Sequence, residues 1–378
     1  MPASLRGGAV VLALMGALAF AGPALASPSP VTGHVYVNGN TTPVNTIVGY
    51  DRHGDGSLSP MPGSPFIAGG SGTGTSIPSQ GAIQVSSDGR YVLAVDAQSS
   101  QISVLRIKRD GTLRLVRDGV VSSGGTNPVS VTEHDGLVYV ANAGSGGSNY
   151  TGFILTRGGQ LLPLPGSTSQ LPDAAQPGDV LFNSTGTNLV GARIGTSQID
   201  SFHVSRFGRL IPAPESPFAA QGPGPFGSEF RPTDPGQLFV SNAHGGPGAG
   251  TVSAFSVAAD GTLSSIGASP FPDRQTAPCW VEITHSGRFL FTVNTASADI
   301  SSYAIAPDGT LSLVGSTPAG GLGAASEDAR LSTDGRNLYV NETGAGVIGE
   351  FTVSGGSLTP IGTVPVSTGH GAAGLASN

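Results

Sequence analysis

The segment from Thr276 to His285, TAPCWVEITH, gathers residue types that nucleophilic catalysis uses. It holds Cys279 and Trp280, the single cysteine and single tryptophan of the chain, followed by Glu282 and His285. A thiol, a carboxylate and an imidazole could serve as nucleophile, acid and base if they met in one site. Whether they can meet depends on the element that carries them.

A turn signature recurs along the chain and divides it into units of about fifty residues. The signature is a glycine, then a small or polar residue, then leucine, and its glycines are Gly56, Gly111, Gly159, Gly208, Gly261, Gly309 and Gly356. Asp-Gly and Gly-Gly between alternating apolar runs predict two-residue hairpin turns, because glycine supplies the positive φ that a twisted hairpin needs. A repeat of this length indicates a closed or stacked array of small units.

Each unit also contains a second strand that ends near a polar residue. These strands are Tyr91 to Asp96, Leu137 to Asn142, Leu189 to Arg193, Leu238 to Asn242, Phe289 to Asn294 and Asn337 to Asn341. Four strands per unit, repeated seven times, predict an all-β seven-bladed β-propeller. The first unit begins at its second strand, Gly33 to Asn38, and the tail Gly371 to Ser377 reads as its missing inner strand. We therefore expect the first blade to be closed by the C-terminal strand, which removes an open sheet edge.

This architecture decides how the opening segment is interpreted. It begins the inner strand of the sixth unit, and a strand rises about 3.3 Å per residue, so Cys279 and His285 lie roughly 20 Å apart. Cys279 and Glu282 point to opposite faces, whereas Trp280 and Glu282 share a face near the channel. We expect Cys279 to be buried, and Trp280 either to pack between blades or to form a ligand platform.

Composition and the N-terminus indicate the class of protein. Formal net charge is -7 and Lys108 is the only lysine, so we expect that no cluster of basic residues exists, which argues against nucleic-acid binding. A single cysteine allows no intrachain disulfide. The apolar run from Ala9 to Ala21, followed by Ala24 and Ala26, predicts a signal peptide over residues 1–26 and an exported single domain over 27–378. The run is too short to span a membrane, so we expect a secreted or periplasmic monomer.

Two motif matches are explained by the fold. Gly222 to Gly227 matches a dinucleotide fingerprint but precedes an inner strand and carries two prolines. Asp51 to Gly56 begins like a calcium loop, yet Pro62 stands where the pattern requires glutamate. We therefore predict neither a cofactor nor a metal.

The repeated units resemble the propeller lactonase family, which includes the propeller type of 6-phosphogluconolactonase and the fungal carboxymuconate cycloisomerases. The resemblance rests on runs such as His285 to Asn294, Asp299 to Tyr303 and Pro307 to Leu311, and it covers about Val31 to Asn378. It implies a histidine and an arginine opening inner strands, in Pro-His and Gly-Pro-Arg-His contexts, and a glutamate in an Asn-Glu pair closing a second strand. Asn341-Glu342 is similar to that pair, but no inner-strand opening carries the histidine or the arginine.

Two classes of function follow. The first is a lactone hydrolase or cycloisomerase acting on a small lactone, with Glu342, His370 and Arg193 as catalytic candidates. The second is a non-catalytic propeller whose loops bind a ligand or protein of the cell envelope. The candidate ligand-binding residues are Arg274, Trp280, Glu282 and His244. Fold by itself does not decide between the two classes.

Overall fold

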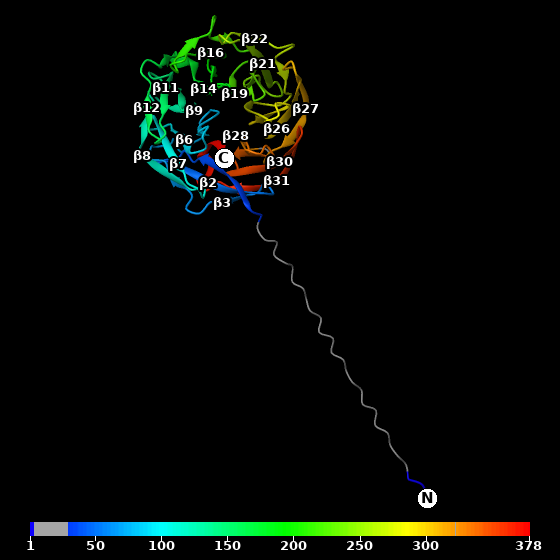
Figure 1. Cartoon of the computed structure of the whole chain (residues 1–378). Coiled ribbons are helices and arrows are strands. Elements are labelled where there is room, and N and C mark those ends of the chain that lie inside the picture. Colours follow the sequence, from blue (N-terminus) through cyan, green and yellow to red (C-terminus); the bar gives the residue numbers. More distant parts are fainter. Residues whose placement is uncertain (4–28, 322) are drawn as a thin grey trace.

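Seven antiparallel sheets surround a central axis (Figure 1), and this arrangement confirms the predicted seven-bladed propeller. The computed structural model describes residues 1–3, 29–321 and 323–378. The predicted signal peptide, residues 1–26, lies outside the described residues except for its first three. No described helix is long and apolar enough to cross a membrane.

The blades are numbered along the chain, and each is given from its inner to its outer strand. Blade 1 contains β32 (Ala373–Ser377), β1 (Val31–Asn38), β2 (Thr46–His53), β3 (Leu58–Pro60) and β4 (Phe66–Ile67). Blade 2 contains β5 (Ile83–Val85), β6 (Tyr91–Asp96), β7 (Gln101–Ile107) and β8 (Leu113–Ser122). Blade 3 contains β9 (Pro128–His134), β10 (Leu137–Asn142), β11 (Asn149–Leu155), β12 (Leu161–Pro163) and β13 (Ser169–Gln170).

The remaining blades follow the same order. Blade 4 contains β14 (Pro177–Phe182), β15 (Asn188–Arg193), β16 (Gln198–Val204), β17 (Leu210–Pro212) and β18 (Phe218–Ala219). Blade 5 contains β19 (Pro225–Arg231), β20 (Asp234–Asn242), β21 (Thr251–Val257), β22 (Leu263–Ser265) and β23 (Phe271–Pro272). Blade 6 contains β24 (Pro278–Ile283), β25 (Phe289–Asn294), β26 (Asp299–Ile305) and β27 (Leu311–Pro318). Blade 7 contains β28 (Ser326–Leu331), β29 (Asn337–Glu342), β30 (Val347–Ser354) and β31 (Ser357–Pro365). Two short 3-10 helices are η1 (Asp173–Ala175) and η2 (Gly369–Gly371).

The hydrophobic core lies between neighbouring blades. One cluster joins Phe291 of blade 6 to Leu338 and Phe351 of blade 7. Second strands such as β6 are buried along their whole length because both faces of the sheet are covered by the adjacent blades. Apolar burial between blades therefore stabilises the ring, while strand ends and loops remain to carry function.

In blades 1 to 6 the hairpins between third and fourth strands are one residue longer than predicted, whereas in blade 7 Ser354 pairs with Ser357 and Gly355-Gly356 forms the predicted two-residue turn. In blade 2 the amide of Gly111 donates to the carbonyl of Lys108, and the amide of Lys108 donates to Thr112, so Arg109 to Gly111 form the loop. Gly111 has a φ of 78°, which confirms the need for glycine. The geometry is a β-turn followed by a left-handed glycine, a common three-residue hairpin.

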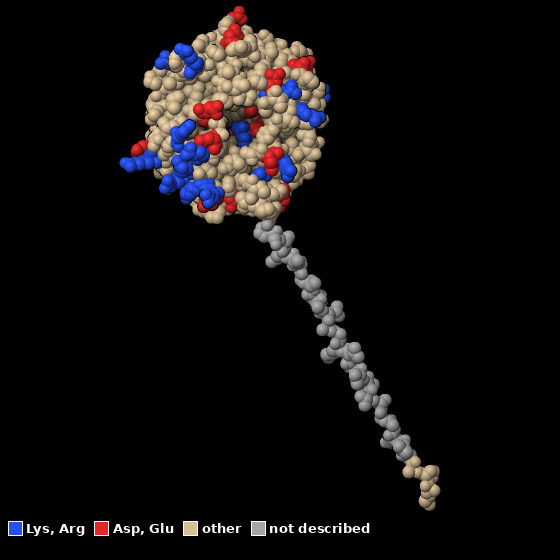
Figure 2. All heavy atoms as spheres, viewed as in Figure 1, with Lys and Arg blue, Asp and Glu red and all other residues tan. Residues whose placement is uncertain are grey.

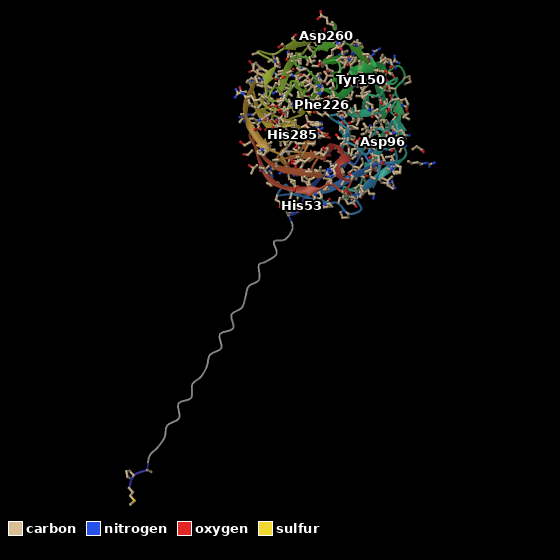
Figure 3. All side chains as sticks on the ribbon, turned by 180° about the vertical axis from the view of Figure 1, so that it is seen from behind. His53, Asp96, Tyr150, Phe226, Asp260 and His285 are labelled. Carbon is tan, nitrogen blue, oxygen red and sulfur yellow. The ribbon has the colours of Figure 1, made fainter. Side chains whose placement is uncertain are left out.

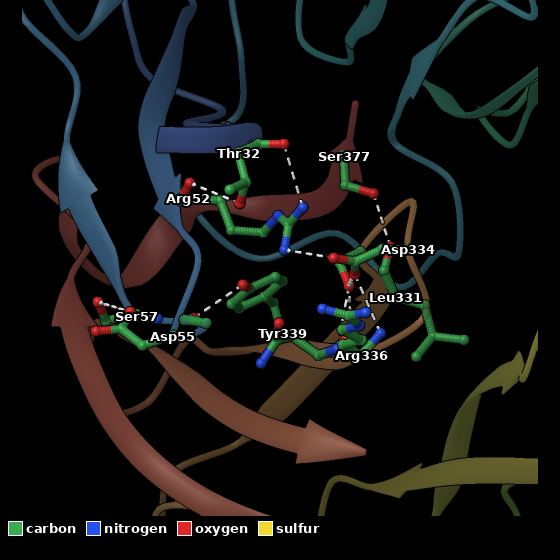
Figure 4. A network of polar contacts seen from close by, with 12 residues as sticks. Thr32, Arg52, Asp55, Ser57, Leu331, Asp334, Arg336, Tyr339 and Ser377 are labelled. Atoms are coloured by element: carbon green, nitrogen blue, oxygen red, sulfur yellow. Dashed lines mark hydrogen bonds and ion pairs between the residues drawn. The ribbon is translucent and has the colours of Figure 1, made fainter. Parts of the chain in front are cut away.

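The chain ends close the ring as predicted. β32 pairs with β1, and Arg52 of blade 1 donates to Asp334 of blade 7 at 3.1 Å. Tyr339 donates to the carbonyl of Gly56 at 2.9 Å, and Ser377 donates to that of Leu331 at 2.7 Å. Figure 4 shows this network at the junction of blades 7 and 1.

The two faces of the ring differ in their connections. We call the loop face the one that carries the links from second to third strands and from one blade to the next. The turn face carries the turns from first to second strands and the hairpins from third to fourth strands. Figure 3 shows Phe226 of the inner strand β19 toward the middle of the ring, whereas Asp260, in a hairpin, lies at the rim.

Candidate functional site

A segment of blade 2 crosses the channel near the loop face. We call residues 76–80 the crossing segment. The Gln80 amide donates to the Gly178 carbonyl at 2.9 Å, and its side chain donates to the Ser228 carbonyl at 2.7 Å. Its side-chain oxygen also accepts from the amide of Val281 at 3.0 Å. Gln80 is buried, and it joins the inner strands of blades 4, 5 and 6.

Trp280 is held by the same segment. Its indole N–H donates to the carbonyl of Ser79 at 2.7 Å, and its ring packs edge-on against Phe226. Trp280 is 3% exposed and Cys279 is also buried. The packing interpretation of both residues therefore fits the structure, and burial raises the pKa of the Cys279 thiol to about 12. The role of Trp280 as a ligand platform stays a prediction. It would require the crossing segment to move away from the indole ring.

On the turn-face side of Gln80 the channel holds a charged cavity of about 170 Å³. Arg330 lies in it, with its guanidinium 3.3 Å from Oε2 of Glu282. Burial raises the pKa of Asp179 to about 7, and it raises the pKa of Glu229 well above its usual value. Figure 2 shows the hollow at the centre of the ring with acidic and basic atoms in it. Glu282 lies near the channel, as expected, but as the partner of Arg330.

A repeated polar pair explains the position of Arg193. In six of the seven blades the last residue of the second strand reaches a polar residue in the third strand or just before it, and we call this position the polar slot. In six blades the pairs are Asn38 with Asn45, Asp96 with Ser103, Asn142 with Asn149, Arg193 with Asp200, Asn242 with Ser253 and Asn294 with Ser301. Arg193 makes two bonds to Asp200, at 2.5 and 2.6 Å, and the Asp200 carboxylate is buried while Arg193 is partly buried. Its guanidinium is therefore engaged within blade 4.

Glu342 occupies the polar slot of blade 7, where the third strand offers no partner. The residue seven positions later is Gly349, and the Glu342 carboxylate lies between Gly349 and Gly320. Glu342 is 1% exposed, and its Oε2 has no hydrogen-bond partner among the described residues. Burial raises the pKa of this carboxyl to about 7. Glu342 is thus a buried acid whose Oε2 has no donor in the part of the chain that the structure describes.

Between blades 7 and 1 the loop face brings together Glu327, Ser76, Thr343 and His370. The Ser76 hydroxyl lies 2.6 and 2.7 Å from the two oxygens of Glu327. Burial raises the pKa of Glu327 to about 7, although Ser76 and Thr343 act to lower it. His370 Nδ1 is 2.8 Å from the Thr343 carbonyl. Because a carbonyl only accepts, Nδ1 carries the proton in neutral His370, and the exposed Nε2 can accept one.

Beside the crossing segment the loop face holds a second, largely apolar pocket of about 380 Å³. Val129, Ile194 and Phe226 line it, with His244 and Gln176 as polar groups. Arg274 is exposed on the link between blades 5 and 6. The structure therefore does not bring Arg193 to Glu342 and His370, since Arg193 lies in blade 4 and the others lie at blades 7 and 1. The catalytic and ligand-binding roles of all seven candidates stay predictions.

Glu327 and Ser76 were not singled out as catalytic candidates from the sequence. Glu327 lies at an inner-strand opening, where the resemblance led us to look for histidine and arginine. Ser76 comes from a loop 251 positions away, and no local pattern links the two residues. Among the described residues, no group of three or more His, Cys, Asp or Glu is arranged to hold a metal ion.

The fold is that of a seven-bladed propeller, and its loop face holds a buried carboxyl. The family described as "Lactonase, 7-bladed beta-propeller" matches residues 34–149 and 228–329. These ranges span more than half of the chain, so the protein belongs to this family.

Solved structures share the fold. A proposed 6-phosphogluconolactonase of Bacteroides uniformis is 20% identical, with a TM-score of 0.72 over 90% of this chain and 98% of that one. A corresponding protein of Bacteroides fragilis is 22% identical, with a TM-score of 0.69 over 92% and 98%. The periplasmic gluconolactonase of Pseudomonas aeruginosa is 17% identical, with a TM-score of 0.69 over 91% and 98%. A search of curated proteins returned no match.

Proposed function

We propose that this protein hydrolyses a small lactone at the loop face, with Glu327 as the base that activates water. The observation that carries the proposal is the contact of Glu327 with the exposed hydroxyl of Ser76, in a setting where burial raises the pKa of the carboxyl to about 7. A general base works best when its pKa lies near the operating pH. Family membership supports a lactone as the substrate class.

The reaction needs one proton to pass from water to Glu327 and then from Glu327 to the leaving oxygen. The Glu327 carboxylate accepts a proton from water as the water oxygen bonds to the lactone carbonyl carbon. The ring C–O bond then breaks, and the leaving oxygen takes a proton from Glu327. The Ser76 hydroxyl can donate to the developing oxyanion, and His370 Nε2 offers a second group for proton transfer. Since Arg193 is paired with Asp200, we assign it a structural role.

We also propose that the protein acts outside the cytoplasm. The support is the apolar run from Ala9 to Ala21 with small residues at the predicted cleavage site. The alternative of a non-catalytic binding propeller is favoured by the apolar pocket beside Phe226, which has few titratable groups. The experiment below separates these alternatives.

The test is proton release by residues 27–378 on sugar, sugar-phosphate and muconate-derived lactones, measured above the spontaneous rate. Glu327→Gln should lower the rate by about 100-fold or more, the usual contribution of a general base. Glu215→Gln removes an exposed carboxylate at another loop and should leave the rate unchanged. No release on any lactone, or full activity in Glu327→Gln, would reject the assignment, and absence of release would favour the binding class.

A further inference from the structure

The turn face carries a basic surface over blades 2 to 4. Figure 2 shows Lys and Arg gathered over β7 and β8, beside the central hollow. The surface consists of Arg90, Arg106, Lys108, Arg109, Arg114, Arg157, Arg206 and Arg209. The expectation that no basic cluster exists is therefore wrong. Four of these residues lie between Arg106 and Arg114 in the sequence, and the turns of equivalent blades bring the other four to the same face.

Two arginines of this surface are held in fixed positions. The guanidinium groups of Arg90 and Arg106 lie 5.4 and 5.3 Å from the centre of the Tyr91 ring. Arg106 donates to the Tyr91 hydroxyl at 2.9 Å, and Arg90 donates to the carbonyl of Arg157 at 3.2 Å. Cation–π contact and hydrogen bonding restrict both side chains, so little further ordering is needed to bind an anion.

The surface also places like charges opposite one another. Arg106 and Arg114 are direct partners across the β7–β8 ladder, an arrangement that destabilises a sheet. Among the described residues, neither belongs to an ion pair. Nearby carboxylates are Asp88, which is 3.8 Å from Arg90, Asp110, which binds its own turn, Asp135, which is near His134, Asp51, which shares a pocket with Arg109, and Glu133, which shares one with Arg157. The cations outnumber them on a chain whose net charge is -7.

Blade 4 adds an aromatic residue at the tip of its hairpin. Blades 1, 2, 5 and 6 have aspartate at this turn position, and each carboxylate accepts from the amide two residues later. Blade 4 has Phe207 instead, 64% exposed, with the Arg206 guanidinium 4.5 Å from its ring centre. The turn thus lacks its stabilising carboxylate and presents a large apolar group to solvent between Arg206 and Arg209.

A shallow groove joins the two parts of this face. It runs between blades 3 and 4, with a volume of about 570 Å³, and Gly136, Ile154, Arg206 and Phe207 are among its lining residues. Ile154 is 39% exposed. Arginines on either side of an exposed aromatic ring, on a face that carries further cations, match a lipid surface, where the ring enters the interface and the arginines bind headgroup phosphates.

We propose that the turn face docks on an anionic lipid surface, with Phe207 inserted and the basic surface on the headgroups. This inference is independent of the loop-face site, because the two lie on opposite faces of the ring. A charge-only partner, such as a sulfated polysaccharide, would use the arginines but would gain nothing from Phe207. The two partners therefore predict different results for a Phe207 variant.

The experiment is co-sedimentation of residues 27–378 with phosphatidylcholine vesicles that contain or lack phosphatidylglycerol. We expect binding only to the anionic vesicles, with affinity falling as salt rises. Phe207→Asn keeps a residue suited to the turn and adds no charge, and it should weaken binding severalfold. Lys108→Glu with Arg109→Glu, at a hairpin tip, should weaken binding by more than about tenfold, since each cation contributes about fivefold.

Arg274→Glu is the matched control, because it reverses an exposed arginine on the loop face, and it should bind like the unchanged chain. Circular dichroism of each variant would verify the fold. Equal binding to both vesicle types would overturn the proposal. Unchanged vesicle binding by Phe207→Asn would also overturn it. So would competition by dextran sulfate that is equally effective for that variant and the unchanged chain, because both results indicate a surface that recognises charge alone.

Discussion

The Ser76 hydroxyl hydrogen-bonds both oxygens of the Glu327 carboxylate, at 2.6 and 2.7 Å, although 251 positions separate the two residues. The contact joins the crossing segment of blade 2 to the inner strand of blade 7. Burial raises the pKa of this carboxyl, and an exposed neighbouring hydroxyl contacts it. Such a carboxyl suits proton transfer near neutral pH.

Lactone hydrolysis should depend on pH through Glu327. Burial raises the pKa of this carboxyl to about 7, and a base acts in its ionised form, so kcat/KM should rise with pH and level off above about pH 7. Ser76→Ala removes a hydrogen bond that lowers this pKa, so the profile should move to higher pH. A profile that is flat from pH 5 to 9 after correction for spontaneous hydrolysis would exclude a titrating carboxyl.

Glu342→Gln should stabilise the protein at and above neutral pH. The folded-state pKa of about 7 lies above the unfolded value near 4.5, so the folded state holds its proton more tightly. Glu342 then destabilises the fold increasingly as pH rises from about 4.5 to 7, by about 3 kcal/mol at the upper end. Thermal melts of both proteins should agree near pH 4 and diverge by pH 8. Equal melting at pH 8 would indicate that Glu342 finds a partner in solution.

Arg193 should matter for stability and not for the lactone reaction. Arg193→Ala leaves the buried Asp200 carboxylate unpaired and should lower the free energy of unfolding by about 3 kcal/mol or more. Arg193→Asn with Asp200→Ser reproduces the Asn294–Ser301 pair of blade 6 and should recover most of the loss. Denaturant unfolding measures both effects. A stable double variant without lactone hydrolysis would return Arg193 to the catalytic candidates.

The single tryptophan and cysteine report on the crossing segment. Trp280 is buried against Phe226, so its emission should be blue-shifted in the native protein and move to longer wavelength on unfolding. Cys279 is buried with a raised pKa, so thiol reagents should modify it only as rapidly as the fold opens. Rapid labelling without a change in emission would mean that β24 opens locally.

The fold was predictable because its signals repeat. Each unit supplies its own glycine turn, so an error in one unit is corrected by the other units. Even the closure of blade 1 followed from a first unit that lacked one strand and a tail that supplied it. The hairpin loops were the exception, since Asp-Gly is compatible with two loop lengths and only the pairing of Lys108 with Thr112 selects the longer one.

The candidate site was less predictable because its contacts join distant units. Arg193 and Glu342 stood out as charged residues at strand ends, but five other blades have polar residues at the same position. The residue seven positions later is Asp200 for Arg193 and Gly349 for Glu342. This difference can be seen in the sequence, and it distinguishes a paired guanidinium from an unpaired acid. By contrast, the Ser76–Glu327 contact follows from no local pattern, and the run from Arg106 to Arg114 marks only part of the basic surface, because the rest depends on how the ring brings the blades together.

The crossing segment also lies in the path of solutes along the channel. Gln80 is bonded to three inner strands and is buried, so it separates the space around Arg330 from the loop-face mouth. A solute that enters at the loop-face mouth therefore meets Gln80 before it reaches the cavity around Arg330. The bonds of Gln80 also link blade 2 to blades 4, 5 and 6 across the channel, which should stiffen the ring against flattening.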